Sequence, residues 1–425
     1  MLHLFKFKSR KIREQHFSYK TIKPIRQRLI LVPVTWLLSI PCAIYHRLKI
    51  NKKNMKGLKP PYILLSTHMG FDDFKVMTMA IMPYRANYVV AIDGFVGVKW
   101  LLEQVGGISK RKFTNDTLLV RHLHHVLQVN KNIAVIYPEA RYSISGTTAI
   151  LPESLGKLVK LNQLPVVVLN CHGHHLANPF WSKYHRYVRY ISDMEQIINQ
   201  TEVSNLSLDE INSRIEKAFY YDEWKWQKDN HIVINTKNRA SGLHKVLYVC
   251  PNCQSESKMK SEKHLLFCPE CGKKWEMTEW GELRALDGET AFSHIPDWYE
   301  WIRRIVAEEV KSGNYFFEDE VRIYSLPNPY GYIYIGKATL QHSKEGFRLF
   351  GTLTNGDEID FSLAPSSTYS IHIEYEHLKR GDCVDLSDLN NTYFVYPTKQ
   401  NVVTKIHFAV EEIYKQLKEK PANSL

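Results

Sequence analysis

A series of short apolar runs separated by helical stretches is the feature that most constrains the fold. Between Pro61 and about Asp193, the runs YILLS, YVVAI, IAVIYP and LPVVVLN alternate with segments such as residues 117–129, where leucine and valine recur at helical spacing. Continuous apolar strands joined by helices are typical of a mostly parallel sheet covered on both faces. We therefore predict an α/β domain over residues 61–239, with functional side chains at the carboxyl ends of its strands.

Two C-x-x-C pairs, CPNC and CPEC, predict a metal site in the next part of the chain. The four cysteines are Cys250, Cys253, Cys268 and Cys271. Four thiolates at this spacing close a tetrahedron around zinc and leave no open position, so the expected role is structural, in a zinc ribbon over residues 240–291. Disulfides are the alternative, but Cys42, Cys171 and Cys383 would be left without partners, which suits a reducing compartment.

The last part of the chain has the pattern of an antiparallel β domain. Residues 320–396 contain short runs rich in tyrosine, isoleucine, valine and phenylalanine, separated by turn signals such as LPNPYG and TNGDE. An amphipathic helix follows, with apolar residues at helical spacing from Val402 to Leu417. We assign residues 292–425 to a β domain closed by a helix, an order that resembles pleckstrin-homology-like domains.

The basic charge of the protein is confined to residues 1–60. The chain carries a net charge of +12, but this segment holds 15 lysine and arginine residues against one acid, and the rest holds 41 basic and 43 acidic residues. Within it lies LILVPVTWLLSIPCAIY, residues 29–45, which is uncharged but interrupted by Pro33 and Pro41. A spanning helix wants about 20 apolar residues without such breaks.

We expect residues 1–60 to be an amphipathic segment that lies on, or dips into, a membrane surface. The flanking lysine and arginine side chains would contact anionic lipid. The expected location is the cytoplasmic face of the cell membrane, as a peripheral or monotopic protein. An ordinary core helix behind a solvated basic arm is the alternative.

The stretch YILLSTHMGFDDF, residues 62–74, brings a histidine and two aspartates to the end of a predicted strand. His68 precedes Asp73 by five positions, so the loop can fold back and let the carboxylate accept the imidazole Nδ1 proton while Nε2 faces a cleft. Such a pair is a general base for a hydroxyl group that belongs to the substrate. A purely structural His–Asp pair is the alternative. We expect the adjacent Asp72 to face solvent.

Three later segments add polar groups near other strands. GGISKRKF brings Lys110, Arg111 and Lys112 together, IYPEARYS ends a strand with Glu139 and Arg141, and LPVVVLNCHG supplies a fourth strand. Guanidinium and ammonium groups suit a phosphate, although each of them also fits a solvated basic loop. In the CHGHH cluster, residues 171–175, we expect a loop of satisfied histidines, because the spacing suits no ordinary zinc motif.

The order of these four segments resembles the sequence blocks of the glycerolipid acyltransferases, the lysophosphatidate acyltransferases in particular. The resemblance covers about residues 60–180. It implies an α/β acyltransferase fold that acts at a membrane surface, with acyl-CoA or acyl carrier protein as donor. It also implies that His68 is the general base and Asp73 its orienting partner. The residues it implies for binding the acceptor are Lys110, Arg111, Lys112, Glu139 and Arg141.

Two departures from the family pattern concern the acceptor. The third block usually reads Pro-Glu-Gly-Thr-Arg, whereas here Arg141 comes one place early, and Lys112 stands where the second block has arginine. The function implied is transfer of a fatty acyl group to a hydroxyl of a lysophospholipid such as 1-acyl-glycerol-3-phosphate.

Two other functions fit parts of the sequence. The same His–Asp pair could activate water, as in a thioesterase or lipid hydrolase. A zinc ribbon could bind nucleic acid, but no nucleic-acid partner is expected because the residues after 60 are not basic overall.

Overall fold

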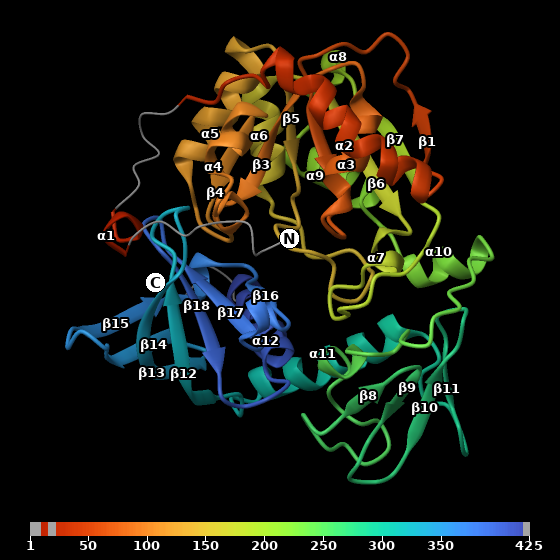
Figure 1. Cartoon of the computed structure of the whole chain (residues 1–425), viewed down its shortest axis with the longest axis vertical. Helices are drawn as coiled ribbons and strands as arrows, with labels where there is room; N and C mark the ends of the chain where they lie inside the picture. Colours follow the sequence, from red (N-terminus) through yellow and green to blue (C-terminus); the bar gives the residue numbers. More distant parts are fainter. Residues whose placement is uncertain (1–9, 16–22, 420–425) are drawn as a thin grey trace.

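The apolar runs after residue 61 form one sheet of seven strands (Figure 1). The computed structural model describes residues 10–15 and 23–419, so the calls on residues 1–9, 16–22 and 420–425 lie outside the described residues. The strand order is β1-β7-β6-β2-β5-β3-β4, and all neighbouring pairs are parallel except β6 with β7. The strands are β1 (Lys49–Lys53), β2 (Ile63–Ser66), β3 (Ala86–Ala91), β4 (Gly107–Lys110), β5 (Ile133–Ile136), β6 (Val166–His172) and β7 (Ile191–Ile198). The mostly parallel sheet is confirmed.

Helices cover both faces of this sheet, which explains why its central strands are continuously apolar. Ile63 and Leu65 of β2 belong to the same core cluster as side chains of α5, α6 and α9, whereas Leu64 joins the cluster that contains α3. Alternate residues of a strand point to opposite faces, so both layers bury β2. The helices are α3 (Asp72–Ile81), α4 (Lys99–Gln104), α5 (Thr117–His124), α6 (Ser154–Asn162), α7 (His174–Ala177), α8 (Gln200–Val203), α9 (Leu208–Ala218) and α10 (Glu223–Asp229).

The N-terminal apolar run forms one helix, α2 (Val32–Tyr45), which packs on α3. Pro33 lies in its first turn, where a missing N–H costs little, and Pro41 lies inside it. One side of α2 is buried through Thr35, Ser39 and Cys42, whereas much of its apolar surface is exposed. Among the described residues, no helix is both long enough and apolar enough to span a membrane.

The two cysteine pairs lie in loops beside a small antiparallel sheet of order β11-β10-β9-β8. Its strands are β8 (Lys260–Glu262), β9 (Leu265–Phe267), β10 (Lys274–Met277) and β11 (Leu283–Ala285). Gly272 follows the second pair with φ +76°, and its N–H donates to the Cys268 carbonyl at 2.9 Å. This left-handed turn favours glycine because a Cβ is strained there.

The C-terminal region contains a second sheet of seven strands, all antiparallel, in the order β15-β14-β13-β12-β18-β17-β16. Its strands are β12 (Phe317–Ser325), β13 (Ile333–Ser343), β14 (Gly346–Thr352), β15 (Glu358–Leu363), β16 (His372–Glu374), β17 (Cys383–Ser387) and β18 (Thr392–Pro397). Two helices accompany it, α11 (Ile295–Lys311) and α12 (Val403–Glu419). The likeness to pleckstrin-homology-like domains stays a prediction.

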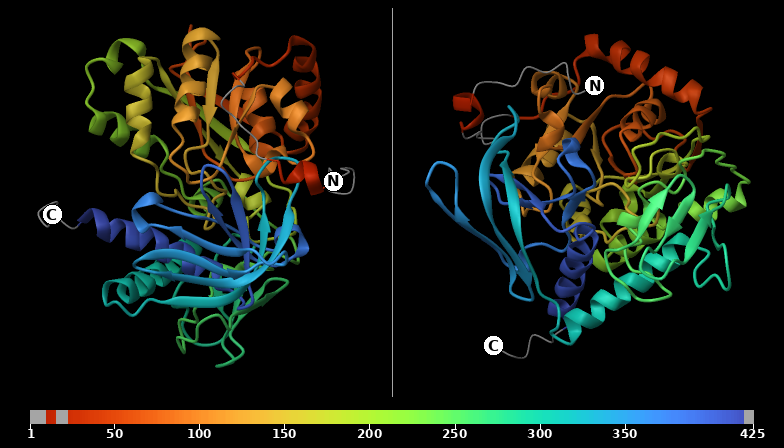
Figure 2. Two further views of the ribbon diagram at one scale, coloured as in Figure 1. Left: turned by 90° about the vertical axis from the view of Figure 1, so that its left-hand side faces the viewer. Right: turned by 60° about the horizontal axis from the view of Figure 1, so that its bottom comes forward.

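The three sheets share one hydrophobic core. A single buried cluster includes residues of the first sheet, the small sheet, α11 and α12. Helix α11 lies between the ribbon and α12: Trp298 packs against Trp275 of β10 at 5.0 Å between ring centroids, and Tyr299 packs against Phe408 of α12 at 4.6 Å. Figure 2 shows the C-terminal sheet packed against one end of the α/β unit. A short helix, α1 (Arg10–Arg13), contacts this sheet through Arg13, which donates to the Tyr332 carbonyl at 2.5 Å.

Candidate active site

His68 and Asp73 lie at the carboxyl end of the central strand β2. The strand ends at Ser66, the chain turns, and α3 begins at Asp72, so both side chains occupy the connection between strand and helix. Asp73 stands in the first turn of α3, where a carboxylate is favoured by the unpaired N–H groups of the helix start. The structure thus brings together the two residues that the sequence predicts as a pair.

Asp73 accepts hydrogen bonds from residues 68–70 and from His174. Its Oδ2 accepts from His68 Nδ1 at 3.0 Å and from the backbone N–H groups of Met69 and Gly70 at 2.7 and 3.0 Å. Its Oδ1 accepts from His174 Nδ1 at 2.6 Å. Burial by itself raises the pKa of Asp73, but the hydrogen bonds from His174 and His68 outweigh it and hold the pKa below its ordinary value. The carboxyl group is therefore ionised and acts only as an acceptor.

The state of Asp73 fixes the tautomer of His68. Because an ionised carboxylate cannot donate, the proton on the His68 ring lies on Nδ1, and Nε2 carries the lone pair. The ring is stacked on Tyr137 at 4.3 Å and lies 4.4 Å from the Tyr142 ring. The side chain keeps 23% of its surface exposed. Nε2 makes no hydrogen bond to any residue in the described part of the chain and is free to take a proton.

His174 is a site residue that the sequence prediction did not assign. It belongs to the CHGHH cluster after β6, which pairs with β2 in the sheet, and it is almost fully buried against Asp73 and Tyr190. Nδ1 of the neighbouring His172 donates to Glu223 Oε1 at 2.9 Å. The cluster itself was visible in the sequence, but its contact with Asp73 depends on which strands are neighbours.

Glu139 lies next to His68 but faces away from any open space. It follows β5, is 1% exposed, and its Oε2 accepts from the His68 backbone N–H at 3.4 Å. Its Oε1 accepts from Tyr221 Oη at 2.9 Å and from the Ala149 N–H at 3.2 Å. Burial raises the pKa of Glu139. In this structure Glu139 forms hydrogen bonds with His68, Ala149 and Tyr221. Its contact with an acceptor stays a prediction.

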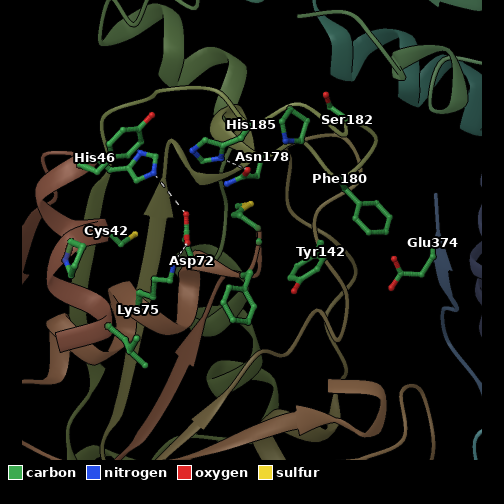
Figure 3. Close-up of a pocket in the computed structure, with 17 residues that line it drawn as sticks. Cys42, His46, Asp72, Lys75, Tyr142, Asn178, Phe180, Ser182, His185 and Glu374 are labelled. Carbon is green, nitrogen blue, oxygen red and sulfur yellow. Dashed lines mark hydrogen bonds and ion pairs between the residues drawn. The ribbon is translucent and has the colours of Figure 1, made fainter. Parts of the chain in front are cut away.

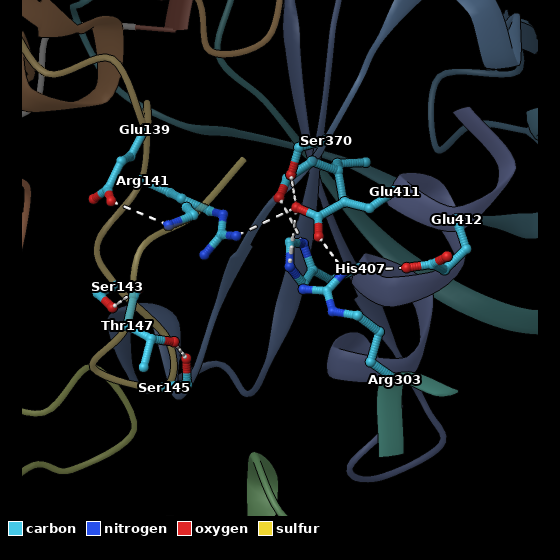
Figure 4. A network of polar contacts seen from close by, with 12 residues as sticks. Glu139, Arg141, Ser143, Ser145, Thr147, Arg303, Ser370, His407, Glu411 and Glu412 are labelled. Carbon is cyan, nitrogen blue, oxygen red and sulfur yellow. Dashed lines mark hydrogen bonds and ion pairs between the residues drawn. The ribbon is translucent and has the colours of Figure 1, made fainter. Parts of the chain in front are cut away.

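Three residues of the predicted phosphate site, Arg111, Lys112 and Arg141, contact the C-terminal domain. Arg141 is buried, and its Nη2 lies 3.3 Å from Glu411 Oε1 of α12 (Figure 4). Arg111 donates to the carbonyl groups of Leu326, Pro327 and Asn390.

Lys112 lies among three carboxylates, with its Nζ 3.1 Å from Asp93, 3.5 Å from Asp385 and 3.9 Å from Glu374. Burial acts against its charge, but these carboxylates raise the pKa of Lys112. Burial lowers the pKa of Lys110, the remaining residue of this group. Binding of a phosphate by these side chains would compete with the contacts described, and it stays a prediction.

A cavity of about 640 Å³ lies beside the loop that follows His68, although His68 itself is not one of the residues that line it (Figure 3). Met69 and Gly70, which follow His68, form part of its wall, and Tyr142 and Phe180 form another part. Leu38 and Tyr45 of α2 also border it and are partly exposed on the protein surface. The cavity therefore extends from the loop after His68 to the exposed side of α2.

The expectation that Asp72 faces solvent is wrong. Its side chain is 14% exposed and borders this cavity, where Lys75 donates to Oδ1 at 2.8 Å and Tyr190 Oη donates to Oδ2 at 3.1 Å. Adjacent positions at the start of a helix point about 100° apart, so Asp72 and Asp73 enter two separate networks.

The four ribbon cysteines fit a tetrahedral metal ion such as zinc. Their sulfur atoms all lie within 4.8 Å of one another, with Cys250 to Cys271 and Cys253 to Cys268 at 3.7 Å. For zinc–sulfur bonds of about 2.3 Å, the edge of a tetrahedron is about 3.8 Å. The donor set and its spacing therefore match the structural zinc site that the sequence predicts.

Comparisons with known proteins find similarity to solved structures but no match by sequence. No protein-family model matches the sequence, and no curated protein matches it. Among solved structures, the chain is similar to the crystal structure of the 1-acyl-sn-glycerophosphate (LPA) acyltransferase PlsC from Thermotoga maritima. The identity is 12%, the TM-score is 0.37, and the similarity covers 44% of this chain and 77% of that chain.

Proposed function

We propose that this protein is a membrane-associated acyltransferase. It moves a fatty acyl group from the thioester of acyl-CoA or acyl carrier protein to a hydroxyl of a lysophospholipid such as 1-acyl-glycerol-3-phosphate. One observation carries the proposal: His68 is held through Nδ1 by a buried, ionised Asp73, while its Nε2 is free and its partly exposed side chain contacts Tyr142, which lines a large cavity.

The chemistry follows from the state of this pair. Nε2 of His68 takes the proton of the acceptor hydroxyl as the oxygen attacks the thioester carbonyl, and Asp73 stabilises the imidazolium that forms. The tetrahedral intermediate then breaks its carbon–sulfur bond, and the imidazolium returns the proton to the departing thiolate. The products are an oxygen ester and a free thiol, and His68 is neutral again. No covalent intermediate on the protein is required.

The exposed side of α2 supports action at a membrane surface. We define the α2 apolar face as Leu37, Leu38 and Ile44, whose side chains are 62–72% exposed. Exposed leucine and isoleucine side chains gain favourable free energy when they move from water into the acyl region of a bilayer. Leu38 and Met69, the residue after His68, both border the cavity, so a lipid acceptor that enters beside Leu38 comes close to the His68 loop.

Product analysis tests the proposed reaction directly. Purified protein is mixed with vesicles that contain one lysophospholipid at a time and with labelled acyl-CoA or labelled acyl carrier protein. We expect the label in a diacyl lipid for at least one acceptor. Release of labelled free acid alone, with no acceptor ever acylated, would instead identify a thioesterase or lipid hydrolase.

A further inference from the structure

Three potential metal ligands line the part of the cavity wall where α2 meets α3. They are Cys42 of α2, His46, which directly follows the last residue of α2, and Asp72 at the start of α3. The backbone N–H of His46 donates to the Cys42 carbonyl, so His46 follows Cys42 by one turn, and its Nε2 lies 3.8 Å from Asp72 Oδ2 of α3. One sulfur, one nitrogen and one oxygen atom of the three lie within 4.8 Å of one another (Figure 3). Neither the proposed reaction nor the ribbon uses this group.

The orientation of His46 is that of a metal ligand. Its ring is 2% exposed and stacks on Tyr190, with the centroids 3.8 Å apart and the planes 4° from parallel. Nδ1 lies 2.7 Å from the Val188 carbonyl oxygen, which can only accept, so the ring proton is on Nδ1. Nε2 therefore carries the lone pair and lies 3.8 Å from Asp72 Oδ2. Histidine ligands in metal sites are held in this way, through the nitrogen that does not bind the ion.

The carboxylate of Asp72 is divided between two partners. Oδ1 accepts from Lys75, while Oδ2 accepts from Tyr190 and is the oxygen nearer to His46. An ion bound by Oδ2 would leave the Lys75 contact in place. Together, a thiolate and a carboxylate neutralise a divalent cation, and a Cys–His–Asp set matches the ligand preferences of zinc.

We propose that Cys42, His46 and Asp72 bind a zinc ion whose fourth coordination position opens into the cavity. Zinc bonds of 2.0–2.3 Å draw the ligand atoms to about 3.5 Å from one another, so binding requires side-chain movements of about 1 Å. Asp73, Cys171 and His174 form another compact group, but it is fully buried and its carboxylate is already engaged by His68. The open position of the proposed site takes a water molecule or a phosphate oxygen.

Metal titration of the full chain tests this site. The protein is stripped of metal, then titrated with Zn²⁺ against a colorimetric competitor and, separately, with Co²⁺ while the absorption spectrum is followed. Wild type should bind one more equivalent than His46→Gln or Asp72→Asn. With Co²⁺, Cys42→Ala should remove a thiolate-to-cobalt band that Cys253→Ser leaves intact. Cys383→Ala, which removes a buried thiol of β17 outside any such group, is the matched control.

Equal zinc stoichiometry in wild type, His46→Gln and Asp72→Asn overturns the proposal. A cobalt spectrum that changes only with Cys253→Ser does so as well. Asp72→Asn preserves the shape of the side chain, so thermal unfolding of the metal-free proteins separates loss of a ligand from loss of the fold. Should one variant fail to fold, the other two decide the outcome by the same readouts.

Discussion

At the scale of single residues, Asp73 is the group on which the proposed catalytic base depends. Four hydrogen bonds converge on its carboxylate, two from backbone N–H groups and two from imidazoles. A buried carboxylate with this many donors is ionised and rigid, so it sets both the tautomer and the angle of the His68 ring. His174 adds to that rigidity from the far side and never reaches the cavity wall.

Asp73→Asn should lower the turnover number of acyl transfer by roughly 10³- to 10⁴-fold, because an amide at this position no longer fixes the proton on Nδ1 of His68. Steady-state kinetics with a saturating acceptor measure the loss. Circular dichroism and thermal unfolding serve as controls for the fold. Turnover within tenfold of wild type would show that the carboxylate does not orient the base.

Sequence alone predicts His68 and Asp73 as a pair because five positions of one loop bring them together. It does not predict His174, which is about a hundred residues away and reaches Asp73 only because β6 pairs with β2. Sequence also does not show that Asp72 and Asp73 enter separate networks, because the directions of their side chains depend on where α3 begins. The spacing of residues along the sequence predicts contacts within one loop, but it does not predict contacts between residues that the sheet brings together.

At the scale of elements, a strand or helix can be predicted from the sequence when its pattern of apolar residues is strong. β2, β5 and β6 are continuous apolar runs because both faces are covered. β1 reads KINKK and has no such pattern; it is a strand because β7 offers it a free edge. Helix α11 is amphipathic but was not anticipated between the ribbon and the β domain, where it packs on both.

The α2 apolar face gives a prediction about membrane binding. Leu37→Glu combined with Ile44→Glu should lower the affinity for anionic vesicles by at least about tenfold, since burial of each apolar side chain contributes about 1.5–3 kcal/mol. Vesicle co-sedimentation measures the partition coefficient. Leu161→Glu is the matched control, because Leu161 is 53% exposed on α6. Equal sedimentation of the double variant and the control contradicts a membrane role for α2.

Metal removal gives a prediction about the ribbon. A strong chelator, or the substitution Cys253→Ser, should unfold the small sheet, because four thiolates without an ion no longer hold its two turns together. Trp275 packs on Trp298 of α11, so its fluorescence should become accessible to a quencher such as iodide. Restored shielding after addition of zinc to the chelated wild type completes the test. Quenching that is unchanged by the chelator would mean that the ribbon folds without a metal.

At the scale of the whole molecule, the C-terminal domain is part of the surroundings of the candidate active site. Arg111, Lys112 and Arg141, which come from the loops after β4 and β5, are all engaged by groups of residues 326–411. These contacts span more than 200 residues of sequence, so no local pattern predicts them. The sequence does identify the basic residues themselves, because an arginine or lysine in a strand-end loop is conspicuous.

Glu411 is the buried carboxylate at the centre of this interface. It contacts Arg141, Arg303 and Ser370, and His407 Nε2 lies 3.4 Å away. Burial raises the pKa of Glu411, but His407 and the two arginines outweigh burial and lower it. Glu411→Gln should lower the free energy of unfolding by about 3–5 kcal/mol, because the buried Arg141 guanidinium loses its ion-pair partner and Arg303 keeps only Glu300 and Glu412.

The same residue predicts a pH dependence. A folded-state pKa below the unfolded value means that Glu411 stabilises the protein at neutral pH, and that this contribution is lost as the pH falls below about 4.3 toward the lowered pKa. Urea unfolding of wild type and Glu411→Gln at several pH values measures both effects. Their stability difference should shrink as the pH falls, and a difference independent of pH would contradict the ion-pair account.

The most direct test of the central claim compares acyl transfer by wild type and His68→Ala in the same vesicles. Both proteins are matched for zinc content and thermal unfolding, and the rate at which label enters the diacyl lipid is measured. Loss of general-base catalysis predicts a rate lower by about 10²- to 10⁴-fold. A His68→Ala variant that is folded and transfers the acyl group at nearly the wild-type rate would contradict the account.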